Sequence, residues 1–308
     1  MILCCGEALV DMIERETVDG HHGYVPFAGG AVFNTAIALG RLGSPVAFFT
    51  GLSTDLFGQI LSKTLSESHV DFSPSSISAR PTTMAFVKLV DGNAKYTFYD
   101  EGTAGRMLLL GDMPVVAANV AAMHFSCISL IFEPCGSTYE ALMLREYKSR
   151  VISLDPNIRA SFITDAAAHR ARIKRMVAIA DIVKVSDEDL DWITEGQNHS
   201  DTISDWLALG VKVVTITRGG DGVDAFTARG QITVPAHRVT VVDTIGAGDT
   251  FNAGFLDGLR LKNVLTKTAV ATLSEDDLVF ALDRGAAAAS VTVSRAGANP
   301  PWLHEMPA

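Results

Sequence analysis

A glycine-rich segment at residues 243–255 (Asp-Thr-Ile-Gly-Ala-Gly-Asp-Thr-Phe-Asn-Ala-Gly-Phe) constrains the fold of this chain more than any other stretch. β-Branched residues from 231 to 242 predict a strand before it, and apolar residues at helical spacing from 250 to 261 predict a helix after it. Gly246 and Gly248 would then lie between a strand and a helix, where glycine lets the backbone turn N–H groups toward one point. The positive end of the helix dipole adds to this effect, so the segment predicts an anion-binding turn.

Two interpretations of Asp249 are open from this pattern. A carboxylate at the start of a helix often caps it by accepting backbone N–H bonds. A carboxylate beside a phosphate-binding turn is also well placed to take the proton from a hydroxyl that attacks a phosphoryl group. Capping explains Asp249 alone, whereas base catalysis also explains the glycines, so we expect a phosphoryl-transfer centre.

The bulk composition indicates one soluble α/β domain over residues 1–308. The chain has 25 basic and 35 acidic residues, and a net charge of −10 disfavours nucleic acid or an anionic membrane as a partner. The N-terminal residues lack the basic and apolar regions of a signal peptide, and no apolar run reaches membrane-spanning length. We therefore expect a cytoplasmic protein. The four cysteines show no metal-ligand or redox spacing and are expected to be buried free thiols.

Strands and helices alternate along most of the chain, which predicts a mostly parallel sheet. Predicted strands at 46–50, 121–126, 151–155 and 211–217 are accompanied by predicted helices at 55–68 and 137–148. The pattern changes between 72 and 99, where segments 84–90 and 95–99, joined by residues 91–93, predict a β-hairpin. The polar stretch 14–26 is expected to form a surface loop or lid.

Two segments resemble the signatures of the ribokinase-like (PfkB) family of sugar and nucleoside kinases. The segment Gly246-Ala-Gly-Asp249 resembles the family's second signature, and the segment Gly29-Gly30-Ala-Val-Phe-Asn34 resembles its first. The resemblance covers nearly the whole chain. It implies a three-layer α/β/α domain with a mostly parallel sheet, covered by a small β lid at about 12–27 and 72–100.

The resemblance also implies roles at the catalytic turn. The amides of Gly246, Ala247 and Gly248 would form an anion hole for the transferring phosphoryl group, and Asp249 would be the base. Asp243 and the loop at 293–298 would enclose a monovalent cation.

Sugar-binding residues are implied at several places. Asp11 would bind sugar hydroxyls, although it is alternatively a solvated acid. The first signature adds Gly29, Gly30 and Asn34 as sugar-binding candidates. The run Asp155-Pro-Asn-x-Arg is shared with similar kinases, so Asn157 is expected to face the sugar and Arg159 the phosphate unless it is an ordinary surface arginine. Arg106 is a further candidate, although Asp100 and Gly105 depart from the Arg and Asp that fructokinases carry nearby.

Nucleotide contacts are implied at Lys184, Ser186, Thr217, Gly219 and Gly222. The turn at 217–222 resembles the family's Thr-x-Gly-x-x-Gly, with a glycine-rich hairpin turn as the alternative. Asp189 would hold Mg²⁺ through water, but Ser186 and Asp189 replace the Asn and Glu of the family pattern. Helix capping is an equally simple account of these two residues.

The sequence thus predicts an ATP-dependent sugar kinase that uses Mg²⁺ and, as a further expectation, K⁺. It is most similar to bacterial fructokinases, so we expect transfer of the γ-phosphoryl group to the terminal hydroxyl of a ketohexose. The alternatives are 2-keto-3-deoxygluconate kinase, another sugar or nucleoside kinase of the family, and an inactive sugar-binding relative. The chain has neither a Gly-x-x-x-x-Gly-Lys-Ser/Thr loop nor a dinucleotide-binding glycine motif after its first strand. An exposed lid sheet needs cover, which favours a homodimer through the lid.

Overall fold

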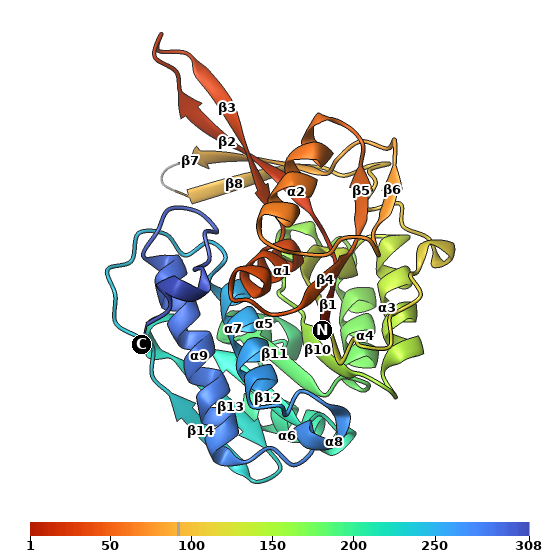
Figure 1. Cartoon of the computed structure of the whole chain (residues 1–308), viewed down its shortest axis with the longest axis vertical. Coiled ribbons are helices and arrows are strands. Elements are labelled where there is room, and N and C mark those ends of the chain that lie inside the picture. The colour runs from red at the N-terminus through yellow and green to blue at the C-terminus, as the bar shows by residue number, and fades with distance from the viewer. Residues whose placement is uncertain (91–92, 308) are drawn as a thin grey trace.

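A central eight-stranded sheet runs through the molecule (Figure 1). The computed structural model describes residues 1–90 and 93–307. The strand order is β14-β13-β12-β11-β10-β9-β1-β4. The six strands β12, β11, β10, β9, β1 and β4 pair in parallel, and β13 and β14 form an antiparallel edge. The strands are β1 (Ile2–Cys5), β4 (Val46–Phe49), β9 (Ala122–Ser126), β10 (Val151–Asp155), β11 (Ile182–Ser186), β12 (Val213–Thr217), β13 (Val223–Thr227) and β14 (Gly230–Val234). The predicted mostly parallel sheet is confirmed.

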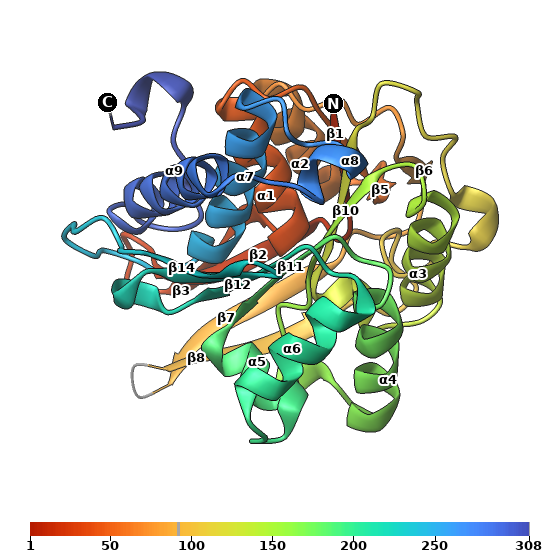
Figure 2. The same ribbon diagram turned by 90° about the horizontal axis from the view of Figure 1, so that it is seen from below.

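Helices cover both faces of this sheet (Figure 2). One face carries α1 (Ala31–Arg41), α2 (Leu56–Glu67), α7 (Ala247–Leu261), α8 (Lys267–Val270) and α9 (Glu275–Val293). The other carries α3 (Cys135–Glu146), α4 (Ala166–Val177), α5 (Asp187–Thr194) and α6 (His199–Leu209). Short 3-10 helices lie at Leu110–Asp112, Cys127–Leu130, Ala160–Phe162, Gly219–Asp221 and Leu303–Glu305. This is the expected three-layer α/β/α arrangement.

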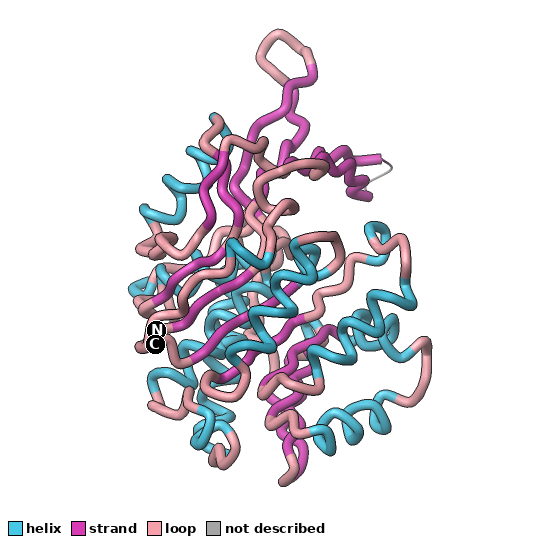
Figure 3. Tube along the Cα trace, turned by 90° about the vertical axis from the view of Figure 1, so that its right-hand side faces the viewer, coloured by secondary structure: helices cyan, strands magenta, loops and turns pink. Residues whose placement is uncertain are grey.

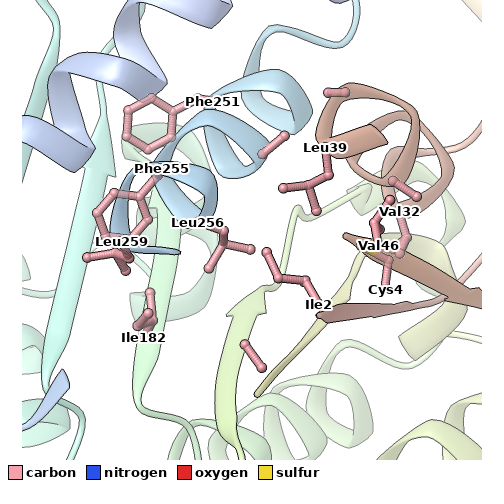
Figure 4. Close-up of a cluster of buried hydrophobic side chains, with 14 of the residues drawn as sticks. Ile2, Cys4, Val32, Leu39, Val46, Ile182, Phe251, Phe255, Leu256 and Leu259 are labelled. Atoms are coloured by element: carbon pink, nitrogen blue, oxygen red, sulfur yellow. The ribbon is translucent and has the colours of Figure 1, made fainter. Parts of the chain in front are cut away.

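The two faces of the sheet belong to two separate hydrophobic cores. On one face, Ile2 of β1 lies toward Leu256 of α7 and Cys4 lies beside Val32 of α1, as Figure 4 shows. Leu3 and Cys5 belong to the core on the opposite face, which includes apolar side chains of α3 and α4. Strand side chains alternate between faces, so a strand buried on both sides must be apolar throughout. All four cysteines are buried and free, as expected.

A second sheet of four strands projects from the main body (Figure 3). Its order is β3-β2-β7-β8, with β2 (Leu9–Glu16), β3 (His22–Gly29), β7 (Met84–Val90) and β8 (Asn93–Tyr99). A small pair, β5 (Gly51–Ser53) and β6 (Ser76–Ser78), lies beside it. The predicted β7–β8 hairpin is confirmed, although residues 91 and 92 of its turn lie outside the described residues. Most of the polar stretch 14–26 is strand, and Asp11 lies inside β2 rather than at its end.

The elements around the glycine-rich segment differ from the predicted bounds. β14 ends at Val234, and residues 235–246 form a loop instead of continuing as strand. Pro235 has no N–H for a ladder, and the amides of Val242 and Asp243 bond to the carbonyl of Val293. Helix α7 begins at Ala247, earlier than predicted, so Asp249 lies in its first turn. Among the described residues, no helix is both long and apolar enough to cross a membrane.

Candidate active site

A cavity of about 730 Å³ opens where the parallel strands reach their carboxyl ends, next to the lid. Ligands of open α/β sheets bind at this edge. Fourteen of the predicted site residues line the cavity: Asp11, Gly30, Asn34, Asn157, Arg159, Lys184, Ser186, Asp189, Thr217, Gly219, Gly246, Ala247, Gly248 and Asp249. The fold thus gathers residues from both signatures and from three strand ends around one space.

The catalytic turn, residues 246–249, enters α7 through a glycine in the left-handed region. Gly246 precedes the helix with φ 76°, which favours glycine. A Cβ atom there would also lie 2.8 Å from the Cβ of Ala298, so the position has no room for a side chain. The first N–H groups of a helix have no partners within it, so the start of α7 presents a positive dipole to the cavity. In the structure the amide of Ala247 donates to the carbonyl of Thr244 at 3.3 Å, a long bond that an anion could replace.

The Asp249 carboxylate lies at the centre of the cavity wall and is only 7 % exposed. Its Oδ2 accepts a 2.9 Å hydrogen bond from Asn34 Nδ2, and its Oδ1 faces Asn157 Nδ2 at 3.5 Å. Burial raises the pKa of Asp249 to about 6, although the Asn34 bond and the charge of Arg159 act in the opposite direction. The carboxylate is therefore held by amide side chains from α1 and from the loop after β10, and it is ionised at neutral pH.

The end of the cavity that is expected to bind the sugar, called the sugar end below, is formed by the start of α1 and by β2. Gly30 has φ 109°, and a Cβ atom there would lie 2.9 Å from the carbonyl oxygen of Glu7. Gly29 lies outside the lining, but a Cβ atom on it would collide with Oδ2 of Asp11. Burial raises the pKa of Asp11 to about 6. Gly29 thus supports the site indirectly, by leaving room for the Asp11 carboxylate.

The end of the cavity that is expected to bind phosphate carries cations and hydroxyl groups. Lys184 lies within 3.0 Å of Asp155 Oδ2, and Arg159 lies in the cavity wall with its Nη1 donating to the carbonyl of Ile158. Thr217 and Gly219 follow β12 at the same edge. Three acidic residues at the start of α5, Asp187, Glu188 and Asp189, line the same end. The two cations of the cavity lining therefore lie at this end among carboxylates, whereas the other end carries Glu7 and Asp11 without a lining cation.

The comparisons with known proteins agree with this geometry. The sequence pattern described as "pfkB family carbohydrate kinase" matches residues 1–305. This chain belongs to that family. It is 59 % identical to a fructokinase of Rhizobium leguminosarum bv. trifolii over 278 residues, which is 90 % of this chain and 85 % of the relative.

Solved structures of this kinase family show the same fold. A fructokinase of Xylella fastidiosa with bound ATP superposes with a TM-score of 0.90 at 26 % identity, covering 99 % of this chain and 94 % of the other. A double-mutant fructokinase of Vibrio cholerae with fructose, ADP and a potassium ion gives a TM-score of 0.84 at 26 % identity, covering 96 % and 93 %. The ribokinase-like fold predicted from the sequence is therefore established.

Besides Gly29, two predicted contacts are not brought to the cavity. Arg106 pairs with Asp100 at 3.0 Å and lies 4.9 Å from the ring centroid of Phe132, outside the lining. Asp100, one of the two residues that depart from the fructokinase pattern, thus holds the guanidinium away from the cavity. Gly222 has φ 97° and also lies outside the lining; a Cβ there would collide with the carbonyl of Val234, so it serves the β12–β13 hairpin.

Ser186 and Asp189 form a capping box at the start of α5. Ser186 Oγ accepts from the amide of Asp189, and Asp189 Oδ2 accepts from the amide of Ser186. Asp189 Oδ1 also accepts from the amide of Ile158 at 2.8 Å, which ties α5 to the loop that carries Arg159. The capping interpretation is confirmed, and each carboxylate oxygen retains a lone pair for a water molecule.

Asp243 links the catalytic turn to the C-terminal loop. Its Oδ1 accepts from the amide of Ile245 and its Oδ2 from that of Gly297, at 3.0 and 2.8 Å. The structure thus brings together the two segments expected to enclose a monovalent cation. The carboxylate oxygens keep lone pairs for such an ion, so the donor set fits.

Glu7 is a lining residue that the sequence analysis did not single out. Its Oε1 accepts from the amide of Ala31 at 2.8 Å, and its Oε2 from that of Ser129 at 3.4 Å. Burial raises the pKa of Glu7 to about 7, and the negative charge of Asp249 adds to the shift. The available signal was an acid inside an otherwise apolar run at residues 2–10. Glu7 ties the start of α1 to the loop after β9 and makes the sugar end more acidic.

Proposed function

We propose that this kinase is a fructokinase, which transfers the γ-phosphoryl group of ATP to the terminal hydroxyl of fructose. The observation that carries the proposal is the buried Asp249 carboxylate beside the Gly246–Gly248 turn, in one cavity whose lining includes the cations Lys184 and Arg159. The 59 % identity to a fructokinase supports the choice of sugar. Three carboxyl groups at the sugar end, Glu7, Asp11 and Asp249, favour a neutral polyol over a sugar acid.

In the proposed reaction, the sugar hydroxyl lies against the Asp249 carboxylate. The hydroxyl oxygen attacks the γ-phosphorus, its proton passes to Asp249, and the bond between the γ-phosphorus and the β–γ bridging oxygen breaks to release ADP. Asn34 orients the carboxylate through its 2.9 Å hydrogen bond. The amides of Gly246, Ala247 and Gly248 receive the charge that develops on the phosphoryl oxygens.

The proposal assigns the remaining contacts as follows. Asp11, Gly30, Asn34 and Asn157 bind the sugar, with Gly29 as a spacer, while Lys184, Ser186, Thr217 and Gly219 face the nucleotide and Arg159 the transferred phosphate. Mg²⁺ enters as the ATP complex, since Mg²⁺ in such sites is held largely by phosphates and water. Asp189 would contact it through water. Asp243 and the C-terminal loop would hold K⁺, which would order the turn.

The proposal includes one domain over residues 1–308, a cytoplasmic location where ATP is available, and a homodimer through the lid. The lid exposes the apolar side chains Tyr24, Val25, Phe27 and Tyr99. Tyr24 and Tyr99 each pack edge-on against Phe86, so these rings form one continuous aromatic patch. A patch of this kind on a sheet needs cover, and a second lid supplies it.

A sugar panel tests the substrate. We expect a coupled assay for ADP release to show the highest kcat/KM with fructose and a value for 2-keto-3-deoxygluconate well behind it. If the sugar acid gives the higher value, the fructokinase assignment is wrong while the kinase assignment stands. If no sugar releases ADP, the chain is an inactive sugar-binding relative.

A further inference from the structure

A buried polar cluster lies directly beneath the catalytic turn. It consists of Lys184 on β11, Asp155 at the end of β10 and Asn252 on α7, which are 4 %, 0 % and 2 % exposed. Asp155 Oδ2 accepts from Lys184 Nζ at 3.0 Å and from Asn252 Nδ2 at 2.7 Å. A buried ion pair costs desolvation free energy and is a weak source of stability, so its presence beside the cavity calls for another explanation.

Asp155 connects three parts of the site through one carboxylate. Besides Lys184 and Asn252, it bonds through Oδ1 to the amide of Asn157 at 3.1 Å. Asn157 in turn faces Asp249. The carboxylate therefore fixes a neighbouring strand, the helix of the second signature and the loop that reaches the base, although the three partners lie 29, 97 and 2 residues away in sequence.

The Lys184 ammonium points at the turn itself. A Cβ atom on Gly248 would lie 3.0 Å from Lys184 Nζ, and Lys184 also lines the cavity. Burial lowers the pKa of Lys184, but Asp155, Asp189 and Asp249 raise it by more, so the side chain stays charged at neutral pH. A fixed positive charge thus lies under the amides that are expected to receive the phosphoryl group.

We propose that Lys184 completes the anion hole from below, and that Asp155 and Asn252 are positioning residues that hold its ammonium against Gly248. The inference rests on the proposed phosphoryl transfer. A fixed charge aimed at developing negative charge stabilises the transition state more than the ground state, so Lys184 acts on kcat. A lysine that only binds nucleotide would act on the KM for ATP.

The test compares Lys184→Met, Asp155→Asn and Asn252→Leu with the wild type. We expect kcat to fall roughly a hundredfold or more for Lys184→Met, by the loss typical of one oxyanion donor. Smaller losses of about ten- to a hundredfold are expected for Asp155→Asn and less for Asn252→Leu, because the ammonium is present but less well held. The KM for ATP should stay within about threefold of wild type.

A matched control is available at the opposite ends of the same strands. Lys267 pairs with the buried Asp181 at 2.8 Å, next to the start of β11 and away from the cavity. Lys267→Met removes a comparable ion pair, so it should lower stability and leave kcat unchanged. Asn252→Leu keeps the Lys184–Asp155 pair and serves as the positioning test if Asp155→Asn does not fold.

The pH dependence of kcat/KM gives a further measurement, because kcat/KM should fall at low pH as Asp249 is protonated. A residue with only a structural role would not change the pH at which this fall, the acid limb, occurs. The groups whose charges act with Asp249 are Arg159, Asp155, Lys184, Glu7 and Cys127. Asp155 raises the pKa of Asp249 and Lys184 lowers it. The limb near pH 6 should therefore move to lower pH in Asp155→Asn and to higher pH in Lys184→Met, and it should stay in place in Lys267→Met.

Each outcome separates the two proposals. If the wild type releases ADP but Lys184→Met keeps a near-normal kcat with a raised KM for ATP, this inference is overturned and the fructokinase proposal stands. If Lys184→Met loses kcat while both Asp155→Asn and Asn252→Leu behave as wild type, the positioning roles are overturned. A wild type that phosphorylates no sugar removes both proposals.

Discussion

The catalytic turn and the lid enclose the same cavity but are held in opposite ways. Helix α7, which carries the turn, packs against α9 and α1, and its polar residues bond to buried partners, such as Thr250 to Thr292 at 3.0 Å. The lid strands β2 and β3 expose much of both faces along their outer half. On the proposed function, phosphoryl transfer depends on a well-packed part of the molecule, and sugar contact depends partly on a less supported one.

This contrast has a physical reason. Asp249 needs an environment that fixes its geometry and raises its pKa, and only a packed interior supplies both. A lid must let the sugar enter and leave, so it is drawn from regions with few buried contacts. Substitutions at the turn should therefore abolish turnover, whereas those in the lid should weaken sugar use without stopping the chemistry.

The largest expected effect belongs to Asp249→Ala. Removal of the base should lower turnover by about two to four orders of magnitude while the fold is retained, as measured by ADP release and circular dichroism. Asp165→Ala is a matched control, because Asp165 caps α4 by accepting from the amide of Ala168. It should cost about 1 kcal/mol of stability with no loss of turnover. Near-normal turnover of Asp249→Ala would contradict the assignment of the base.

Gly29→Ala probes the base of the lid. The new Cβ collides with the Asp11 carboxylate, and overpacking of about 1–3 kcal/mol should lower kcat/KM for the sugar roughly ten- to a hundredfold. The KM for ATP should not change. At Gly23, near the far end of the same strand, a new Cβ would lie 3.2 Å from the Thr17 side chain and 3.9 Å from the carbonyl oxygen of Arg15, so Gly23→Ala should behave as wild type. If Gly29→Ala instead raises the KM for ATP, the lid and the turn are not independent.

The response to potassium sharpens the comparison from the other side. Addition of K⁺ to a buffer free of Na⁺ and K⁺ should raise activity roughly five- to tenfold, the size of a modest coupling between sites. Asp243→Ala should remove the response, since its carboxylate joins the turn to the C-terminal loop. A flat response in the wild type, with Asp243→Ala equally active, would remove the cation site.

The smallest expected effect is a gain in stability. Burial raises the pKa of Asp249 to about 6, so the ionised carboxylate destabilises the folded state above that pH. Asp249→Asn should stabilise the fold by about 1 kcal/mol at pH 8. This gain is smaller than the free energy that corresponds to the whole pKa shift, because the substitution weakens the hydrogen bond from Asn34. The gain should vanish as the pH falls through 6 toward 4. A thermal melt that shows no gain at pH 8 would mean that the carboxylate is well solvated.

Local patterns in the sequence predicted most of the fold and most of the cavity. Buried parallel strands are apolar throughout, and turns that require glycine are visible as glycine, so the sheet and the catalytic turn were predictable. The residue pattern at 14–26 did not indicate strand because most of its residues are polar, whereas the family resemblance implied a β lid at about 12–27. Residues 235–242 were predicted to be strand because they include several valines. In the structure these valines are exposed and belong to a loop.

The side-chain partners were less predictable, since they depend on contacts between distant parts of the chain. Arg106 has the right charge for a phosphate or carboxylate, yet Asp100 and Phe132 hold it elsewhere. Asp155 was noted only as the end of a strand, although it bonds to Asn252 across 97 residues. One sequence shows which residues are available at the edge of the sheet but not which pairs they form there.

The contact between Asp243 and Gly297 also bears on how the enzyme is made. The two residues lie 54 positions apart, and Ala298 packs directly on Gly246, so the turn takes its final shape only after this late segment has docked. Synthesis proceeds from the N-terminus, and every lining residue of the cavity precedes that segment. A nascent or truncated chain that ends before residue 297 therefore carries all the cavity residues without a properly formed anion hole.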